Sequence, residues 1–379
     1  MARFSNIFDC FAGSASGQSL LRCMEKGGVF SVNGVTGAAQ PFLAAFLKHT
    51  FAKRTLLVVA PNNKAQERLH QDLGTWLRLE SSSVPLSFFP EWEVMPHEAR
   101  LPHGGIIRER LQTLDSLAHS PIICATAPSL AQRTLSAQML KQRVRTIGKG
   151  DQVTIDELLS WLAVQGYARF PQVGQRGEMA RRGGIVDVFP YTSALAFRLD
   201  FFGDEVESIR TFDPVTQLSV DTVEQVVLSP GGEVGLLQNE PATAKSTLLD
   251  HLPKDTIVVL CEAEEISLSL QDYFARVPAE DSYHCALDSI YEWLRSENRI
   301  VVGLSELESI PMLGDDSAPA CGLDLRAMDL AVGEKLSEAL VQVADIRRKE
   351  FFNLIHRWWR RRSRSGCRRK LRGAQVWLP

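Results

Sequence analysis

Continuous apolar stretches alternate with helix-like stretches in the first 142 residues. The apolar stretches are short and hold a single polar residue, Ser87, as in strands buried on both faces, whereas the segments between them repeat apolar residues every three or four positions. The expected strands are Leu56–Ala60, Leu86–Phe89 and Ile122–Ala125, and the expected helices are Asn63–Leu77 and Gly105–Ala118. Strands that alternate with helices predict a parallel sheet covered on both faces. We therefore expect an α/β lobe over residues 1–142.

The same pattern returns between residues 230 and 345. Strands are expected at Thr256–Cys261 and Ile300–Leu304, with helices between them. This segment predicts a second α/β lobe that accompanies the first. Glu262 follows the first of these strands and superficially resembles an acidic metal ligand, but we interpret it as the start of a helix.

Residues 143–229 have a different character. A capping box at Thr154–Glu157 begins a helix that Gly166 ends, and short strands with alternating apolar and polar positions follow. Gly203-Asp204 is a favourable two-residue turn between the strands of a hairpin, Phe197–Ile209. The pattern predicts an α+β domain with an antiparallel sheet, inserted between the two lobes.

The two faces of the hairpin differ in chemistry. With Gly203-Asp204 at the turn, a period of two places one set of residues on the core face and another on the opposite face. The core set is Phe197, Leu199, Phe201 and Val206, and the opposite set is Arg198, Asp200, Phe202, Glu205, Glu207 and Ile209. An aromatic side chain among charges is a candidate anchor for a protein partner. The alternative is that Phe202 is covered by the helix or by the N-terminal loop.

The segment Gly34–Pro41 has the outline of a phosphate-binding loop between a strand, Val29–Val32, and a helix, Pro41–His49. In the intact motif a second glycine, a lysine and a hydroxyl residue bind phosphates and Mg²⁺. Those positions hold Ala39, Gln40 and Pro41. Only Gly34 and Gly37 remain, so we expect no ATP binding and no ATP hydrolysis here. An ordinary strand-to-helix turn is the alternative.

The last 34 residues, 346–379, begin as an amphipathic helix and then become strongly basic. Residues 347–379 hold 12 Lys and Arg and one acidic residue, although the whole chain has a net charge of −3. Three interpretations stay open: a disordered tail, a change of reading frame near residue 360, and nonspecific nucleic-acid binding. The composition of the whole chain, 45% hydrophobic, is typical of a soluble protein of two or three domains. No run of 18 apolar residues and no secretory signal is present, so we expect a cytoplasmic protein without a membrane span.

No constellation of catalytic or metal-binding residues stands out. His97 and His103 flank a turn without a nucleophile beside them, and Glu91, Glu93 and Glu98 are expected to be solvated loop charges. The seven cysteines are scattered without a C-x-x-C pair. We therefore expect no enzyme activity, no metal and no cofactor.

Several segments resemble bacterial transcription-repair coupling factors, in the part of that family that is similar to the excision-repair protein UvrB. The resemblance covers about residues 15–358. The segments that carry it are Gly177–Pro190, Arg198–Arg210, Phe212-Asp213, Phe89–Pro96 and Arg108–Leu114. It implies RecA/helicase-like lobes, a degenerate nucleotide loop, and a middle domain that docks the damage sensor UvrA.

The resemblance also implies which residues contact UvrA. The family's contact positions fall on Arg182, Arg198 and Phe202, with Arg181 and Glu205 as further candidates at the rim. The chain is thus expected to be an adaptor that recruits UvrA in transcription-coupled nucleotide excision repair. The family's RNA polymerase-binding and DNA-translocating domains would lie beyond this chain, so RNA polymerase and DNA are not expected as its direct partners.

Two other functions remain as alternatives. One is a UvrB-like, ATP-dependent helicase subunit, against which the degenerate loop and the lack of a long Tyr-rich insertion before residue 105 argue. The other is nonspecific nucleic-acid binding through the basic tail, which predicts an affinity that falls steeply with salt.

Overall fold

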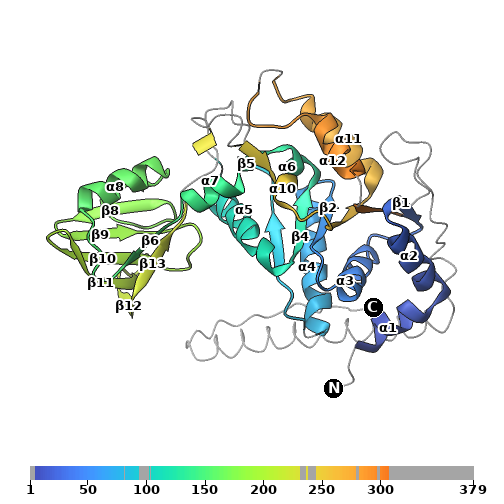
Figure 1. The fold of residues 1–379 in the computed structure, drawn as a ribbon, viewed down its shortest axis with the longest axis horizontal. Coiled ribbons are helices and arrows are strands. Elements are labelled where there is room, and N and C mark those ends of the chain that lie inside the picture. Colours follow the sequence, from blue (N-terminus) through green and yellow to red (C-terminus); the bar gives the residue numbers. More distant parts are fainter. Residues whose placement is uncertain are drawn as a thin grey trace, which may run out of the picture.

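The computed structural model describes residues 5–80, 82–93, 102, 104–230, 236–237, 245–278, 281–296 and 299–306. They form a larger part, here the parallel-sheet domain, and a smaller antiparallel domain beside it (Figure 1). The elements of the parallel-sheet domain are α1 (Ser5–Gly13), α2 (Ala15–Lys26), β1 (Gly28–Asn33), α3 (Gln40–Thr50), β2 (Leu56–Ala60), α4 (Asn63–Leu79), β3 (Leu86–Phe89), α5 (Gly104–Ser116), η2 (Leu117–His119), β4 (Ile122–Thr126), α6 (Ala127–Ala131), β5 (Arg133–Leu135), α7 (Ala137–Gln142), β14 (Lys245–Thr247), α10 (Leu248–His251), β15 (Ile257–Cys261), α11 (Ala263–Phe274), α12 (Leu287–Arg295) and β16 (Ile300–Ser305).

One sheet replaces the two expected lobes. Its order is β1-β16-β15-β2-β4-β3, and its strand pairs are parallel. Strands β15 and β16, expected in a separate lobe over residues 230–345, therefore lie between β1 and β2. The physical reason is that two buried strands do not make a stable sheet alone, whereas inserted here they gain neighbours on both sides. Residues 307–345 of the expected second lobe lie outside the described residues.

Helices cover both faces of this sheet, as the alternation predicted. Alternate residues of each central strand point to opposite faces: Val58 packs with α1 to α4, and Val59 packs with α6, α10, α11 and α12. The α/β fold class is thus confirmed. The helix pair α1 and α2 was not predicted; its residues Phe8 and Phe11 pack against Phe42 and Phe46 of α3.

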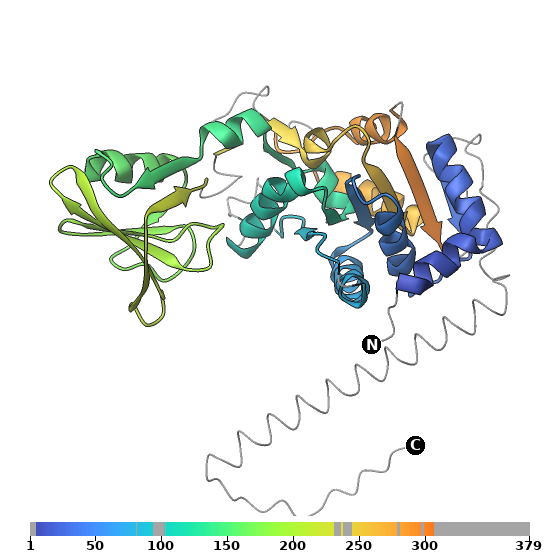
Figure 2. The same cartoon turned by 60° about the horizontal axis from the view of Figure 1, so that its bottom comes forward.

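The antiparallel domain has its own sheet and core. Its elements are β6 (Arg145–Gly148), α8 (Ile155–Val164), β7 (Ala168–Arg169), β8 (Glu178–Arg182), β9 (Ile185–Val188), β10 (Ala196–Phe202), β11 (Glu205–Phe212), β12 (Ser219–Val223) and β13 (Gln225–Leu228). The sheet order is β12-β11-β10-β9-β8-β7, and β6 pairs with β13 where the chain enters and leaves the domain. Figure 2 shows this domain projecting from the end of the parallel-sheet domain. Helix α8, which Thr154 caps, packs on one face of the sheet.

The hairpin of β10 and β11 corrects one predicted position. Phe202 pairs with Glu205 and Phe201 with Val206, but Asp200 pairs with Ser208, so Glu207 is an extra residue in β11. Such a β-bulge reverses the side-chain alternation beyond it. Ile209, expected on the charged face, is instead fully buried in the core opposite Leu199.

Some other expectations concern residues beyond the described ranges. Residues 346–379, together with His97, Glu98 and His103, lie outside them. Glu91 is described and is not a freely solvated charge: it accepts hydrogen bonds from Thr126 (3.0 Å) and Asn63 (3.1 Å), and burial raises its pKa above the ordinary value. Among the described helices, none is long and apolar enough to cross a membrane.

Candidate functional site

One face of the antiparallel sheet carries a row of charges, which we call the arginine face. Its members, placed together by the strand register, are Ala180, Arg182, Asp187, Arg198, Asp200, Phe202, Glu205 and Arg210. The face opposite, with Leu199 and Ile209, packs on α8 and forms the domain core. The sequence pattern therefore predicted correctly that Arg198, Asp200 and Phe202 share one face.

Asp187 is the centre of the arginine face. Its side chain is only 1% exposed, and both of its oxygens accept hydrogen bonds from arginines. Arg198 donates from Nε to Oδ1 (2.7 Å) and from Nη2 to Oδ2 (2.9 Å), and Arg182 donates from Nη2 to Oδ2 (2.5 Å). This carboxylate was not singled out from the sequence. The signal for it is a charged residue between the apolar residues Val186 and Val188 of a buried strand.

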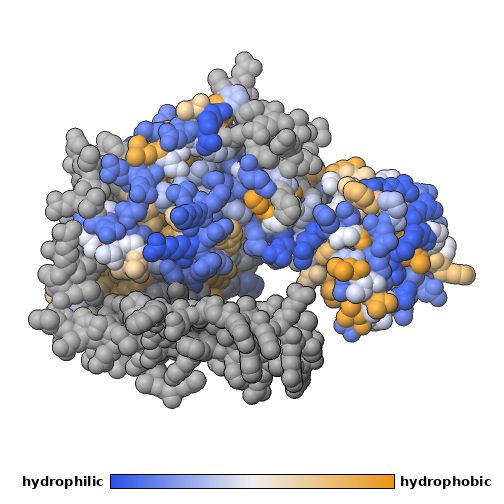
Figure 3. Space-filling view, turned by 180° about the vertical axis from the view of Figure 1, so that it is seen from behind, coloured by the Kyte–Doolittle hydropathy of each residue, from blue (hydrophilic) through white to orange (hydrophobic). Residues whose placement is uncertain are grey.

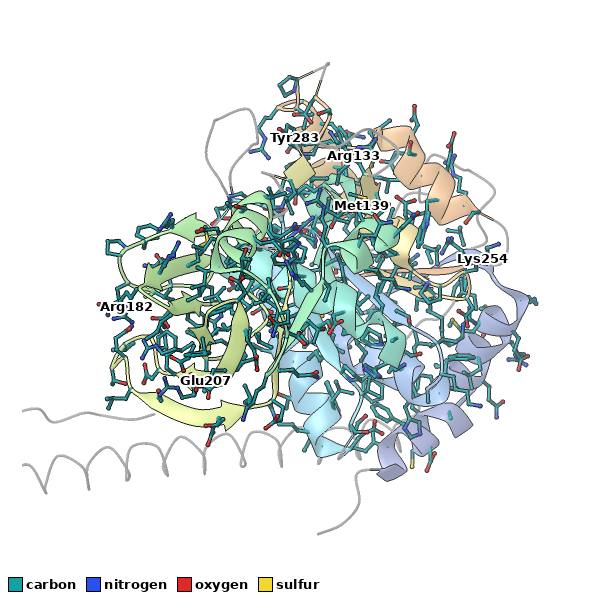
Figure 4. All side chains as sticks on the ribbon, turned by 60° about the vertical axis from the view of Figure 1, so that its left-hand side comes forward. Arg133, Met139, Arg182, Glu207, Lys254 and Tyr283 are labelled. Atoms are coloured by element: carbon teal, nitrogen blue, oxygen red, sulfur yellow. The ribbon has the colours of Figure 1, made fainter. Side chains whose placement is uncertain are left out.

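The two arginines that Asp187 binds differ in exposure. Arg198 is 14% exposed and also stacks on the ring of Phe212, with its guanidinium carbon 4.5 Å from the ring centroid. Its hydrogen bonds to Asp187 raise its pKa above the ordinary value, although burial acts in the opposite direction. Arg182 is 47% exposed and stands at the outer edge of the domain (Figure 4). Of the two side chains, that of Arg182 is the more exposed to solvent.

Phe202 is exposed, so the alternative in which another segment covers it does not hold for the described residues. Its exposed fraction is 79%, and it directly precedes Gly203, whose φ of +64° forms the turn. Phe201 donates its N–H to the Gly184 carbonyl (2.9 Å), so the turn after β8 and the turn after β10 meet at one end of the sheet. Arg182 and Phe202 both lie at that end. Figure 3 shows further apolar areas on the surface of this domain.

The two candidates for the rim lie in different places. Arg181 has the opposite side-chain direction from Arg182 and binds Asp156 at the start of α8, Nη1 to Oδ1 at 2.6 Å. Glu205 is exposed beside the turn and accepts a hydrogen bond from Gln152 (3.2 Å). The structure thus groups Glu205 with Phe202 and separates Arg181 from the arginine face.

A second polar cluster on the same face was also missed from the sequence. Asp200 accepts hydrogen bonds from Arg210 (2.7 Å) and Ser208 (2.5 Å). These partners come together because of the bulge at Glu207, which the sequence pattern did not indicate. Arginine and aspartate therefore alternate across neighbouring strands of the face.

The segment Gly34–Pro41, in which the sequence has the outline of a degenerate nucleotide loop, lies in the parallel-sheet domain, at the carboxyl ends of β1, β2 and β15. A cavity of about 590 Å³ is lined by Gly37, Gln40 and Pro41 together with residues of α4 and the segment after β15. Gln40 is buried, and its amide Nε2 donates to the Glu262 carboxylate Oε1 (2.5 Å) and to the Val35 carbonyl (3.5 Å). Gly34 has a φ of +77°, and Ala39 caps the helix without a side-chain hydrogen bond.

Glu262 directly precedes α11, which confirms its interpretation as a helix start. Burial raises its pKa, and the hydrogen bond from Gln40 acts against that rise. The position of the missing lysine is therefore filled by an uncharged amide whose hydrogen bonds are made within the protein.

Comparisons with known proteins agree with this division of the molecule. The profile of the family described as UvrB interaction domain matches residues 146–233. The transcription-repair-coupling factor of Haemophilus influenzae is 40% identical over 179 residues, which are 47% of this chain and 15% of that protein. Those of Escherichia coli and Myxococcus xanthus are 32% identical over 201 residues and 27% identical over 270 residues, covering 52% and 69% of this chain.

The aligned parts make up less than a quarter of each of these relatives, with 17% of the Escherichia coli protein and 22% of the Myxococcus xanthus protein covered. Within this chain, the matched family profile begins in β6 and ends just after β13, so it coincides with the antiparallel domain. Residues 146–233 therefore match the UvrB interaction domain family, in a chain that is similar to transcription-repair-coupling factors over about half of its length.

Proposed function

We propose that this chain recruits UvrA as an adaptor in transcription-coupled nucleotide excision repair in the cytoplasm. The observation that carries the proposal is an exposed phenylalanine, Phe202, at the same end of the sheet as the exposed Arg182, in a segment that matches the UvrB interaction domain family. The relatives supply the context, because their name, transcription-repair-coupling factor, joins transcription to repair.

The chemistry of this surface suits a protein partner. Aromatic and arginine side chains contribute most to the energy of many interfaces, and arginine binds carboxylates through two parallel hydrogen bonds. In this proposal Phe202 enters an apolar pocket of UvrA and Arg182 binds an acidic group beside that pocket. Arg198, held by Asp187 and Phe212, stabilises the surface, and Glu205 lies at its rim.

We further propose that the chain neither binds nor hydrolyses ATP and needs no cofactor. Pro41 has no backbone N–H to offer a phosphate, and Gln40 brings no positive charge and is already bound to Glu262. The expected result is that the purified chain shows no ATP turnover above background and no saturable binding of a fluorescent ATP analogue. Saturable turnover that follows the protein through purification would contradict this part of the proposal.

Calorimetric titration of the purified chain with UvrA tests the adaptor role. Replacing Phe202 with alanine is expected to weaken UvrA binding at least about 30-fold, since anchors of this kind contribute about 2 kcal/mol or more. The side chain is already exposed in the free chain, so its removal leaves no cavity and should not change the stability of the fold.

Val215→Ala is the matched control. Val215 is apolar and 87% exposed, and it lies in the loop between β11 and β12, away from the turn at Gly203. Its replacement is expected to change UvrA affinity less than about twofold. Equal losses in both variants, or no binding by the folded wild-type chain, would refute the proposed docking surface.

A further inference from the structure

The buried carboxylate of Asp187 has no contact with solvent that would let it bind a partner directly. We propose that Asp187 is the positioning residue of the docking surface: it holds Arg198 as a fixed support and aims Arg182 at the partner. This inference rests on the proposed binding of UvrA, but the part in which Asp187 holds the two arginines concerns the free chain alone.

The strand register puts Asp187 where one carboxylate can reach both arginines. Asp187 on β9 pairs with Arg198 on β10 and with Ala180 on β8. Arg182 lies two residues beyond Ala180 on the same face, which is a diagonal neighbour position. Because β9 is the strand between the other two, its carboxylate links the β8 and β10 arginines across the middle of the sheet.

The bonds made by each arginine assign them different roles. Arg198 uses two nitrogens on Asp187 and one face of its guanidinium on Phe212, so little of it is available to another molecule. Arg182 uses only Nη2 on Asp187 in the contacts that are described, and almost half of its side chain is exposed. Asp187 therefore binds Arg198 through two nitrogens and Arg182 through one, and the more exposed Arg182 has further guanidinium nitrogens to offer a partner.

Fixing Arg182 in advance lowers the cost of binding. An arginine that is free in solution loses rotamer freedom when a partner binds it, and holding it beforehand removes much of that cost. The same carboxylate compensates two positive charges that otherwise lie close together on one sheet face. Asp200, the other acid at the middle of this face, is bound to Arg210 and Ser208 and does not replace Asp187.

The test uses Asp187→Asn in the full chain, with two measurements. Nitrogen-15 NMR of arginine side chains follows the Nε–H of Arg198 in the free chain, where its bond to Asp187 should give a slowly exchanging signal. Titration with UvrA gives the affinity. We expect Asp187→Asn to abolish the slow Arg198 signal and to weaken UvrA binding about tenfold or more.

A double-mutant cycle separates positioning from a general structural effect. If Asp187 acts through Arg182, then Asp187→Asn should cost little further affinity in an Arg182→Ala background, whereas independent effects would add. The matched control is Glu157→Gln, which removes a carboxylate from an exposed pair with Arg145 (2.8 Å) outside the arginine face. It should leave both measurements unchanged.

Each other outcome overturns a defined part of the inference. A slowly exchanging Arg198 signal that persists in Asp187→Asn refutes the proposal that Asp187 holds Arg198. Loss of that signal with unchanged UvrA affinity refutes the positioning role. If wild-type chain with the signal intact does not bind UvrA, the proposed function fails and the positioning role fails with it. If Asp187→Asn does not fold, Asp187→Glu keeps the charge but displaces both guanidinium groups by a methylene, and unchanged affinity in that variant refutes the role.

Discussion

Replacing Arg110 with alanine is expected to destabilise the parallel-sheet domain by about 3 kcal/mol and to leave UvrA affinity unchanged. Arg110 of α5 is fully buried, with its guanidinium carbon 4.1 Å from the centroid of the Phe89 ring and 5.0 Å from that of Trp92. Its Nη1 donates to the carbonyl of Pro90 (3.0 Å) and to Gln132 (3.1 Å). Alanine removes these contacts and leaves a cavity beneath the segment after β3.

Denaturant unfolding followed by tryptophan fluorescence measures this loss. Arg78→Ala is the control, because Arg78 is an exposed arginine of α4 whose described hydrogen bond is to Thr75 on the same helix. It should change the free energy of unfolding by less than about 0.5 kcal/mol. A loss below about 1 kcal/mol in Arg110→Ala would show that the buried guanidinium contributes little. A parallel loss of UvrA affinity would show that the antiparallel domain depends on this core.

Gly17→Ala is expected to have a comparably large effect, about 3 kcal/mol, at the corner between α1 and α2. A Cβ atom on Gly17 would overlap the backbone carbonyl of Phe11, and a backbone group cannot move aside as the end of a flexible side chain can. The clash would displace α1, whose Phe8 and Phe11 pack against α3.

Thermal unfolding of the two alanine variants at this corner measures the effect. Gly13→Ala is the matched control, because an added Cβ there meets no atom within 4 Å. It should leave the melting temperature nearly unchanged or raise it slightly, since alanine restricts the unfolded chain. Similar melting temperatures for the two variants would mean that the corner adjusts without cost.

The sequence predicted the bounds of the strands better than their order in the sheet. Leu56–Ala60 and Leu86–Phe89 are strands with the expected bounds, since a short and mostly apolar run between turn residues favours a strand. Their order was not predictable in the same way. The position of β15 and β16 inside the first sheet depends on contacts between residues about 200 positions apart, such as Ile257 with Leu56, and local patterns carry no information about such pairs.

The docking surface was also predicted only in part, because some of its features are local to one strand and others depend on pairing between strands. Period-two alternation placed Phe202 and Arg198 on one face, because alternation is a local property of a strand. The bulge at Glu207 was missed, and with it the burial of Ile209, because a bulge depends on the pairing of two strands and not on one strand's pattern. Alternation also could not show that Arg198 is held by Asp187 from a neighbouring strand.

The place where the chain enters and leaves the antiparallel domain has a consequence for evolution. Thr146 pairs with Val227 and Ile147 with Val226, so the first and last strands of the domain are hydrogen-bonded partners. A host protein therefore has to offer only two chain ends separated by the width of one strand pair. Such a unit can be inserted into a different scaffold without changing the core of either part. A docking surface carried on a unit of this kind can be shared among proteins whose remaining parts do different work.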